Sequence, residues 1–164
     1  MELFMDYMNY SIFQNIIDRT FKSQSTLKVS IKISPIDFFN QKKSISEIHR
    51  TITNSKQVVG SQCNREFWKT HFNAGLYTYR IDKEYILVEY YLNTQTDITE
   101  SLIRNLKTRI KKVIWCEVKV EITDSMKNNM NHLYNHDGTG MRFIGEGHKI
   151  QQHLSTSNLI SWDH

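Results

Sequence analysis

Residues 76–122, LYTYRIDKEYILVEYYLNTQTDITESLIRNLKTRIKKVIWCEVKVEI, decide how this chain is expected to fold. The stretch opens with two runs rich in β-branched and aromatic residues, Leu76–Ile81 and Tyr85–Leu92. A polar link of three residues, Asp82-Lys83-Glu84, separates the two runs. Strand-forming runs on either side of a short polar link are typical of a β-hairpin.

A helix and a further strand are expected after this hairpin. Apolar residues at helical spacing predict a helix over 97–111, and Asp97 and Glu100 have the spacing of a capping box at its start. From residue 114 the period falls to two, which predicts a half-buried antiparallel strand over 114–122. Cys116 alternates with valines on the inward face of that strand, where a cysteine usually behaves as a small apolar side chain.

The first half of the chain contains a similar strand and helix. Strict alternation of apolar and polar residues predicts a strand over 27–33. Pro35 ends this strand, because the residue before a proline is disfavoured in the helical region. A helix is expected over 36–54, and Ser44 and Glu47 form a second capping box within it.

Residues 56–75, KQVVGSQCNREFWKTHFNAG, allow two interpretations. Residues 58–60 are consistent with a short strand. The aromatic residues that follow stand among basic ones, a pattern that suits stacking on nucleic-acid bases with cations on the phosphates. The same aromatics would equally close one end of the apolar core. The residues concerned are Phe67, Trp68 and Phe72, with Arg65, Lys69 and His71.

The elements in order give βαββαβ, so we expect an α+β, ferredoxin-like domain over residues 26–122, with an antiparallel sheet and two helices on one face. Residues 1–25 form an N-terminal amphipathic helical extension, which packs on the body or on a partner. Residues 123–164 are rich in Asn, Gly and His, and are expected to be an extended C-terminal tail that a partner orders.

Composition limits the possible functions. The apolar fraction of 39% and the aromatic fraction of 12% are normal for a folded protein. A mean hydropathy of −0.52 predicts no membrane insertion. The formal charge of +4 and the pI near 9.0 favour polyanionic partners. Cys63 and Cys116 are the two cysteines, too few for a disulfide framework or a four-cysteine zinc site.

The chemistry-bearing residues do not predict an enzyme. Cys63 or Cys116 with His71 or His49 as a base is conceivable, but no pair of acids stands out and no glycine-rich motif has phosphate-loop spacing. His132 and His136 are four residues apart, yet no third metal ligand has matching spacing. We therefore expect no catalytic residues, no metal, no cofactor and no small-molecule substrate.

Basic residues remain as the candidate binding site. Several of them, Arg109 included, are expected to converge on one side of the sheet, where they would neutralise RNA phosphates and make binding depend on salt. Lysines at the end of the second helix also complement its dipole. The RNA-binding candidates are Lys28, Lys32, Lys56, Arg65, Lys69, His71, Arg80, Lys83, Lys111 and Lys112.

Two stretches of the chain resemble a known family. LKVSIKISPIDFFNQKKSISEIHRTITNSKQVVGS, residues 27–61, is similar to the opening of the small-subunit ribosomal protein ten family, and NTQTDITESLIRNLKTRIKKVIWCEVKVEI, residues 93–122, to its closing segment. The resemblance implies a non-catalytic constituent of the small ribosomal subunit's head. It also implies ribosomal RNA and other small-subunit ribosomal proteins as partners.

The chain departs from that family in its hairpin. The family's long hairpin reaches RNA with a basic tip, whereas here the link is only Asp82-Lys83-Glu84. The added ends and modest charge resemble a divergent mitochondrial form, and the start lacks transit-peptide character, so we expect a protein of the mitochondrial matrix encoded in the organelle. The alternative is a small phage or viral assembly protein, cytoplasmic or in the virion, that acts through protein contacts.

Overall fold

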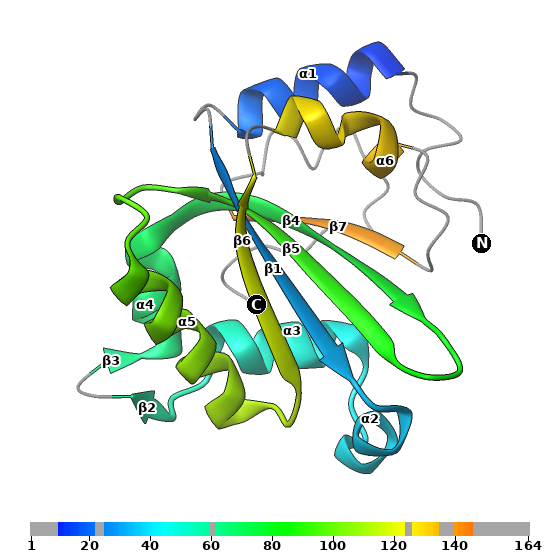
Figure 1. Cartoon of the computed structure of the whole chain (residues 1–164), viewed down its shortest axis with the longest axis vertical. Helices are drawn as coiled ribbons and strands as arrows, with labels where there is room; N and C mark the ends of the chain where they lie inside the picture. Colours follow the sequence, from blue (N-terminus) through cyan, green and yellow to red (C-terminus); the bar gives the residue numbers. More distant parts are fainter. Residues whose placement is uncertain (1–9, 22–24, 60–61, 124–125, 135–139, 146–164) are drawn as a thin grey trace.

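An antiparallel sheet of five strands organises the protein, and its strand order is β6-β1-β5-β4-β7 (Figure 1). The computed structural model describes residues 10–21, 25–59, 62–123, 126–134 and 140–145. The α+β class and the antiparallel sheet are confirmed. The strands are β1 (Thr26–Ile33), β4 (Phe72–Ile81), β5 (Ile86–Thr94), β6 (Glu117–Thr123) and β7 (Gly140–Gly145).

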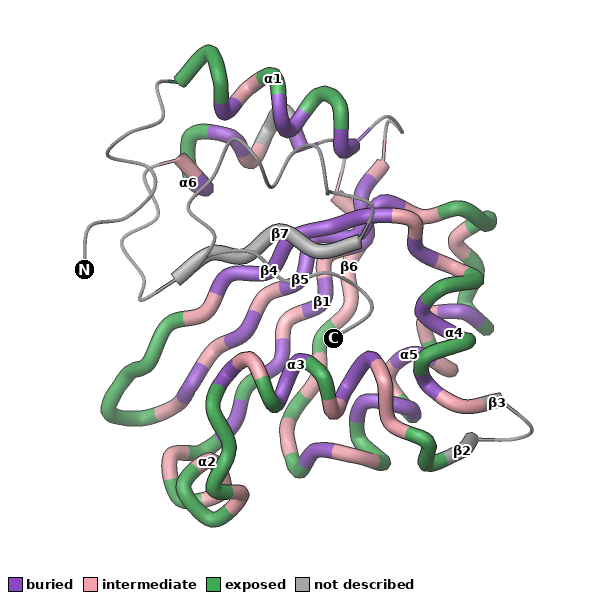
Figure 2. Tube along the Cα trace, turned by 180° about the vertical axis from the view of Figure 1, so that it is seen from behind, coloured by how far each residue is buried: buried purple, intermediate pink, exposed green. Residues whose placement is uncertain are grey.

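Three helices cover one face of this sheet, namely α3 (Ile45–Asn54), α4 (Asn64–His71) and α5 (Glu100–Val113). The predicted alternation of β1 is confirmed, since its inward apolar residues are buried beneath the helices (Figure 2). Burying large apolar side chains provides most of the stability of such a layer. A separate two-stranded ribbon, β2 (Val58–Val59) with β3 (Gln62–Cys63), contacts α5.

A second layer covers one end of the opposite face. It consists of α1 (Tyr10–Thr20), the 3-10 helix η2 (Met126–Asn129) and α6 (Met130–Tyr134). The apolar stripe of α1 packs on the body of the protein, one of the two alternatives open from sequence. The apolar core between this second layer and the sheet comprises Phe13, Ile16, Ile17, Phe21, Leu76, Tyr91, Met126, Met130 and Leu133.

The predicted helix over 36–54 is two helices. The first, α2 (Pro35–Gln41), ends where Lys42 adopts a left-handed conformation with φ 52°. The second, α3, begins after Ser44, whose predicted capping box with Glu47 is present. A capping box fixes a helix start because it satisfies the first backbone N–H groups. The same motif therefore interrupts the longer helix that periodicity predicted.

Two further details of the helices differ from prediction. The helix α5 is capped by Thr99, which accepts a hydrogen bond from the N–H of Leu102 at 3.1 Å, so the predicted capping box of Asp97 and Glu100 is wrong. The helix α4 is absent from the elements that the sequence predicts. Its N-cap residue, Cys63, makes no side-chain cap, so the usual sequence signal of a helix start is missing.

The C-terminal extension is folded where the structure describes it. The segment 126–134 packs against α1, and residues 140–145 pair with β4 as β7. The prediction of an extended tail is therefore wrong for these two segments. Pairing with β4 explains the second segment, because a sheet edge offers unpaired backbone groups to any nearby strand. Apolar packing against α1 explains the first. Residues 124–125, 135–139 and 146–164 of the predicted tail lie outside the described residues.

Candidate nucleic-acid interface

The basic candidates on the sheet do not share a face with those on α5. Lys28 and Lys32 point away from the helical layer, because their neighbours in β1 face α5. Lys111 and Lys112 end α5 on the opposite side of the sheet. The predicted convergence of these residues on one side is therefore wrong. Strand alternation fixed the orientation of the lysines in β1, but only packing decided which face α5 covers.

Acidic residues stand beside the sheet-face cations. The Nζ atom of Lys28 lies 3.3 Å from an Oε atom of Glu89. Lys32 pairs in register with Glu117 of β6, and its Nζ lies 4.8 Å from the centre of the Tyr85 ring. Cross-strand pairs of opposite charge stabilise a sheet. This face therefore offers a phosphate backbone little net positive charge.

The hairpin carries the next two candidates. Arg80 Nε lies 3.5 Å from a carboxylate oxygen of Asp82, and the backbone N–H of Asp82 donates to the carbonyl of Tyr85 at 3.0 Å. The turn between β4 and β5 is therefore tight. Lys83 is exposed at its tip. One exposed lysine beside a paired arginine is a small basic surface.

The helix α5 presents a continuous basic face. Lys111 and Lys112 are exposed in its last turn, and Lys107 and Arg104 lie one and two turns earlier on the outer side. Sequence reasoning missed Arg104 and Lys107, although basic residues three and four apart share a helix face. Among the described residues, no carboxylate lies within ion-pair distance of these four cations.

The remaining candidates extend this basic surface around the helical layer. Arg65 and Lys69 are exposed on α4, and Lys56 is exposed between α3 and β2. Figure 1 shows α4, α5 and the β2–β3 ribbon gathered on one side of the molecule. Over the helices α2, α3, α4 and α5 and the links next to them, exposed or half-buried cations outnumber carboxylates. The cations are Lys42, Lys43, Arg50, Lys56, Arg65, Lys69, Arg104, Lys107, Lys111 and Lys112, and the carboxylates are Asp37, Glu47, Glu66, Asp97 and Glu100.

The aromatic residues beside α4 belong to the core. Phe67, Trp68 and Phe72 are buried, and the Trp68 ring lies 5.2 Å from that of Phe72 and 5.6 Å from that of Tyr90. They therefore close the end of the core and are not exposed for stacking on bases. His71 is half-buried. Burial, and secondarily Arg109, lower the pKa of His71 from its usual value, so His71 is neutral at pH 7 and adds no cation.

Arg109 is a buried cation of structural importance. Its Nε donates to Asn105 Oδ1 at 3.1 Å, its Nη1 donates to Asn64 Oδ1 at 3.2 Å, and its guanidinium lies 4.4 Å from the centre of the Phe67 ring. Asn64 in turn donates to the carbonyl of Ile52 at 3.1 Å. Arg109 therefore joins α5 to α4 and α3, and is inaccessible to RNA.

Replacing Asn64 with alanine is expected to lower the free energy of unfolding by about 2–3 kcal/mol, because a buried charged donor and a buried carbonyl each lose a partner. Urea unfolding checks this as a lower midpoint at constant slope. Asn40→Ala, the same change at an exposed position of α2, is the control and should stay within about 0.5 kcal/mol. A loss of similar size in both variants contradicts the assigned role of Asn64.

The cysteines and histidines of the catalytic alternative lie in different environments. Burial raises the pKa of the Cys116 thiol to about 12, so this side chain remains protonated at neutral pH. His49 is buried with its Nδ1 2.9 Å from the Tyr90 hydroxyl, and its ring stacks on Tyr77. Cys63 is half-buried at the start of α4.

The described residues contain neither a metal-ligand cluster nor a membrane-spanning helix. Within these residues, no three His, Cys, Asp or Glu side chains gather as metal ligands do. His132 is exposed on α6, and His136 lies outside the described ranges. In the same part of the chain, no helix combines the length and apolar character that crossing a bilayer requires.

Comparisons with models of protein families, with curated proteins and with solved structures found no match to this chain. The candidate interface therefore depends on its own geometry, which is a basic helical layer over a sheet whose opposite face is close to neutral.

Proposed function

We propose that this protein is a non-catalytic RNA-binding protein, and that it is a structural constituent of a mitochondrial small ribosomal subunit. The observation that carries the RNA-binding proposal is the basic face of α5, where Arg104, Lys107, Lys111 and Lys112 have no carboxylate partner among the described residues. Cations that are not neutralised within the protein are available to release counterions from a phosphate backbone.

The fold supports the ribosomal part of the proposal. We propose a ferredoxin-like domain, in which the first and third strands are central, the fourth lies beside the first, and the second beside the third. Here the first to fourth strands are β1, β4, β5 and β6, and their order β6-β1-β5-β4 fits this pattern. The helices α3 and α5 come after the first and third strands and lie on the same face of the sheet. The fold alone does not determine function. It is, however, the fold that the resemblance to small-subunit ribosomal protein ten requires.

The proposal assigns RNA contact to the helical layer and not to the hairpin. The tight turn at Asp82 and the ion pair of Arg80 leave little basic surface there. The helical layer carries most of the accessible cations, including Lys56, Arg65 and Lys69. The remaining surfaces, including the outer side of α1, are available to neighbouring ribosomal proteins.

Co-sedimentation tests this proposal. In a gradient of lysate from the source organism, the protein should travel with small ribosomal subunits and remain there after a high-salt wash, because an integral constituent is held by many contacts at once. Association with particles that lack ribosomal RNA would instead support the alternative, a phage or viral assembly protein. Free protein in every fraction would overturn the ribosomal assignment.

Binding by the purified full chain tests the RNA-binding part separately. Its affinity for RNA should fall steeply as salt rises, with a linear relation between the logarithms of the binding constant and the salt concentration. Binding that is absent at low salt would overturn the RNA-binding proposal itself.

A further inference from the structure

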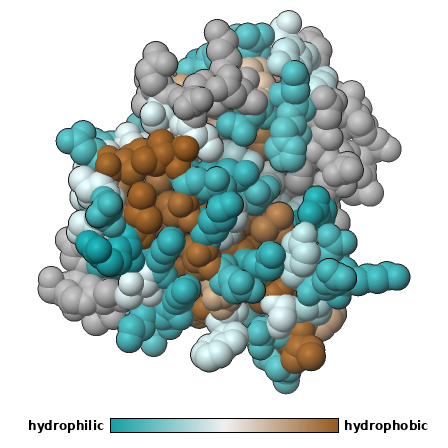
Figure 3. Space-filling view, in the orientation of Figure 1, coloured by the Kyte–Doolittle hydropathy of each residue, from teal (hydrophilic) through white to brown (hydrophobic). Residues whose placement is uncertain are grey.

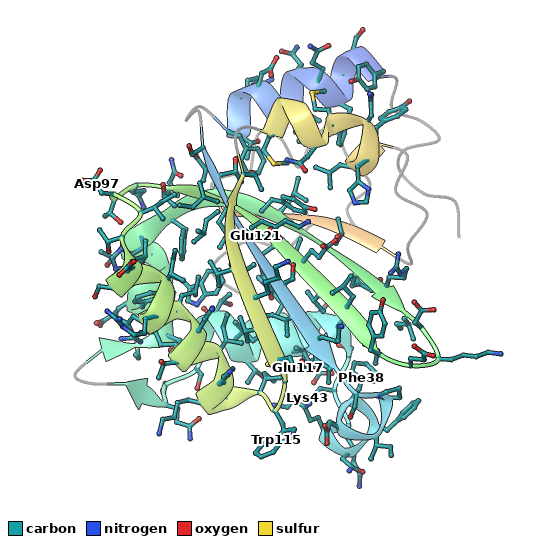
Figure 4. All side chains as sticks on the ribbon, in the orientation of Figure 1. Phe38, Lys43, Asp97, Trp115, Glu117 and Glu121 are labelled. Atoms are coloured by element: carbon teal, nitrogen blue, oxygen red, sulfur yellow. The ribbon has the colours of Figure 1, made fainter. Side chains whose placement is uncertain are left out.

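A corner of the molecule exposes large apolar side chains next to the basic face. Trp115, in the link between α5 and β6, is 79% exposed, and Phe39 and Ile36 of α2 are 73% and 72% exposed. Figure 4 shows Trp115 and Lys43 close together at this corner. Figure 3 shows apolar atoms on the surface over α2, with hydrophilic atoms beside them. A large aromatic ring that is exposed next to cations is available to stack on a nucleic-acid base.

A hollow lies between these two elements. It has a volume of about 400 Å³ and is lined by Asp37, Asn40, Gln41, Lys43, Val113 and Trp115. The volume is within the range of sites that hold a small organic group. Its lining combines one large aromatic face with amide groups that donate and accept hydrogen bonds.

Four lysines surround the corner. Lys42 and Lys43 follow α2, and Lys111 and Lys112 precede Trp115 at the end of α5. Lys42 adopts φ 52° at the end of α2, a position where glycine is usual. A lysine in this left-handed conformation has a slightly higher backbone energy than glycine would have. Two carboxylates lie near: Asp37 lines the hollow and accepts the Ser34 hydroxyl at 2.7 Å, and Glu117 is opposite Lys32 in register. The four lysines outnumber them.

We propose that this corner binds the unpaired bases of single-stranded RNA. Trp115 supplies an aromatic face for stacking at the edge of the hollow, and the surrounding lysines neutralise the adjacent phosphates. The inference rests on the proposed function, and it assigns to that function a class of RNA, single strands. A protein partner is disfavoured because lysine is depleted at the centres of protein interfaces.

The test compares Trp115 variants of the full chain. Their binding is measured to a single-stranded RNA of about 12 nucleotides, which is within the site sizes of single-strand-binding domains, and to a duplex of the same length. Trp115→Leu should weaken single-strand binding roughly 5- to 150-fold, because one stacked base is lost. Duplex binding should not change, since the bases of a duplex are already stacked on one another.

Two further variants separate stacking from other effects. Trp115→Phe keeps an aromatic ring and should retain most of the single-strand affinity, whereas leucine keeps only apolar surface. The salt dependence should be the same for wild type and Trp115→Leu, because both proteins neutralise the same phosphates. Phe39→Leu changes an exposed aromatic side chain that does not line the hollow, so it is the control and should leave single-strand binding unchanged.

The outcomes distinguish this inference from the proposed function. If wild-type protein binds RNA with strong salt dependence and Trp115→Leu binds single strands as tightly as wild type, or Phe39→Leu weakens binding as much as Trp115→Leu, the stacking site is overturned and the basic face is left intact. The stacking site is also overturned if Trp115→Leu and Trp115→Phe weaken single-strand binding equally. It is likewise overturned if Trp115→Leu weakens duplex binding as much as single-strand binding. Wild-type protein that binds no RNA overturns the proposed function as well.

Discussion

Replacing Trp68 with alanine is expected to lower the free energy of unfolding by about 3–5 kcal/mol, the range for truncating a large buried aromatic side chain. The Trp68 ring is buried between α4 and the sheet, against Phe72 and Tyr90. Alanine would leave a cavity that the surrounding strands cannot fill. Chemical denaturation of the purified full chain measures the loss as a shift of the unfolding midpoint.

Trp115→Ala is the matched control, because it makes the same chemical change at a side chain that is 79% exposed. Its expected effect on the free energy of unfolding is within about 0.5 kcal/mol. The pair of variants tests whether the aromatic residues near α4 are core and the tryptophan after α5 is surface. Similar losses in both variants would contradict that assignment.

Neutralising the basic face of α5 is expected to reduce RNA affinity strongly. The variant carries Arg104→Gln, Lys107→Gln, Lys111→Gln and Lys112→Gln together. Since an exposed ion pair contributes roughly 0.2–1 kcal/mol, removing all four cations should weaken binding roughly 4- to 800-fold at low salt. With single-stranded RNA, the slope of log affinity against log salt should also decrease by about 0.7 for each phosphate that the variant no longer neutralises. Equilibrium titrations at several salt concentrations measure both quantities.

The control variant removes the same charge from the opposite side. It carries Lys32→Gln, Arg80→Gln, Lys83→Gln and Lys119→Gln, on the sheet face and the hairpin. If RNA binds to the basic face of α5, the control variant should retain most of the RNA affinity and nearly all of the dependence of that affinity on salt. Equal losses in the two variants would mean that only net charge matters, and would contradict a localised interface. Unfolding midpoints check that both variants are folded.

Much of the local structure was predictable from sequence, because it depends on neighbouring residues. Alternation over 27–33 and the hairpin of β4 and β5 require only period-two patterning and a short polar link. The capping box of Ser44 and Glu47 joins residues that are three apart in the chain. The missed helix α4 shows the limit of this approach. It is short and has no capping side chain, so no local signal distinguishes it from a loop.

The candidate site was predictable in part. Lys111 and Lys112 are candidates from sequence, and the spacing of Arg104 and Lys107 on the same helix would have extended that prediction. Trp115 also carried a signal, since it shares the register of the polar residues Glu117 and Lys119 and not that of the inward valines. That position predicts an exposed tryptophan.

The sequence by itself determined most of the strands, the start of α3 and the excess of basic residues. Only the tertiary structure decided that Phe67 and Trp68 are core, that Arg109 is buried between helices, and that the sheet-face and helical-face cations are separated. The physical reason is that burial and charge pairing depend on which distant elements pack together. Glu89 neutralises Lys28 because β5 lies beside β1, whereas Lys111 has no carboxylate partner among the described residues.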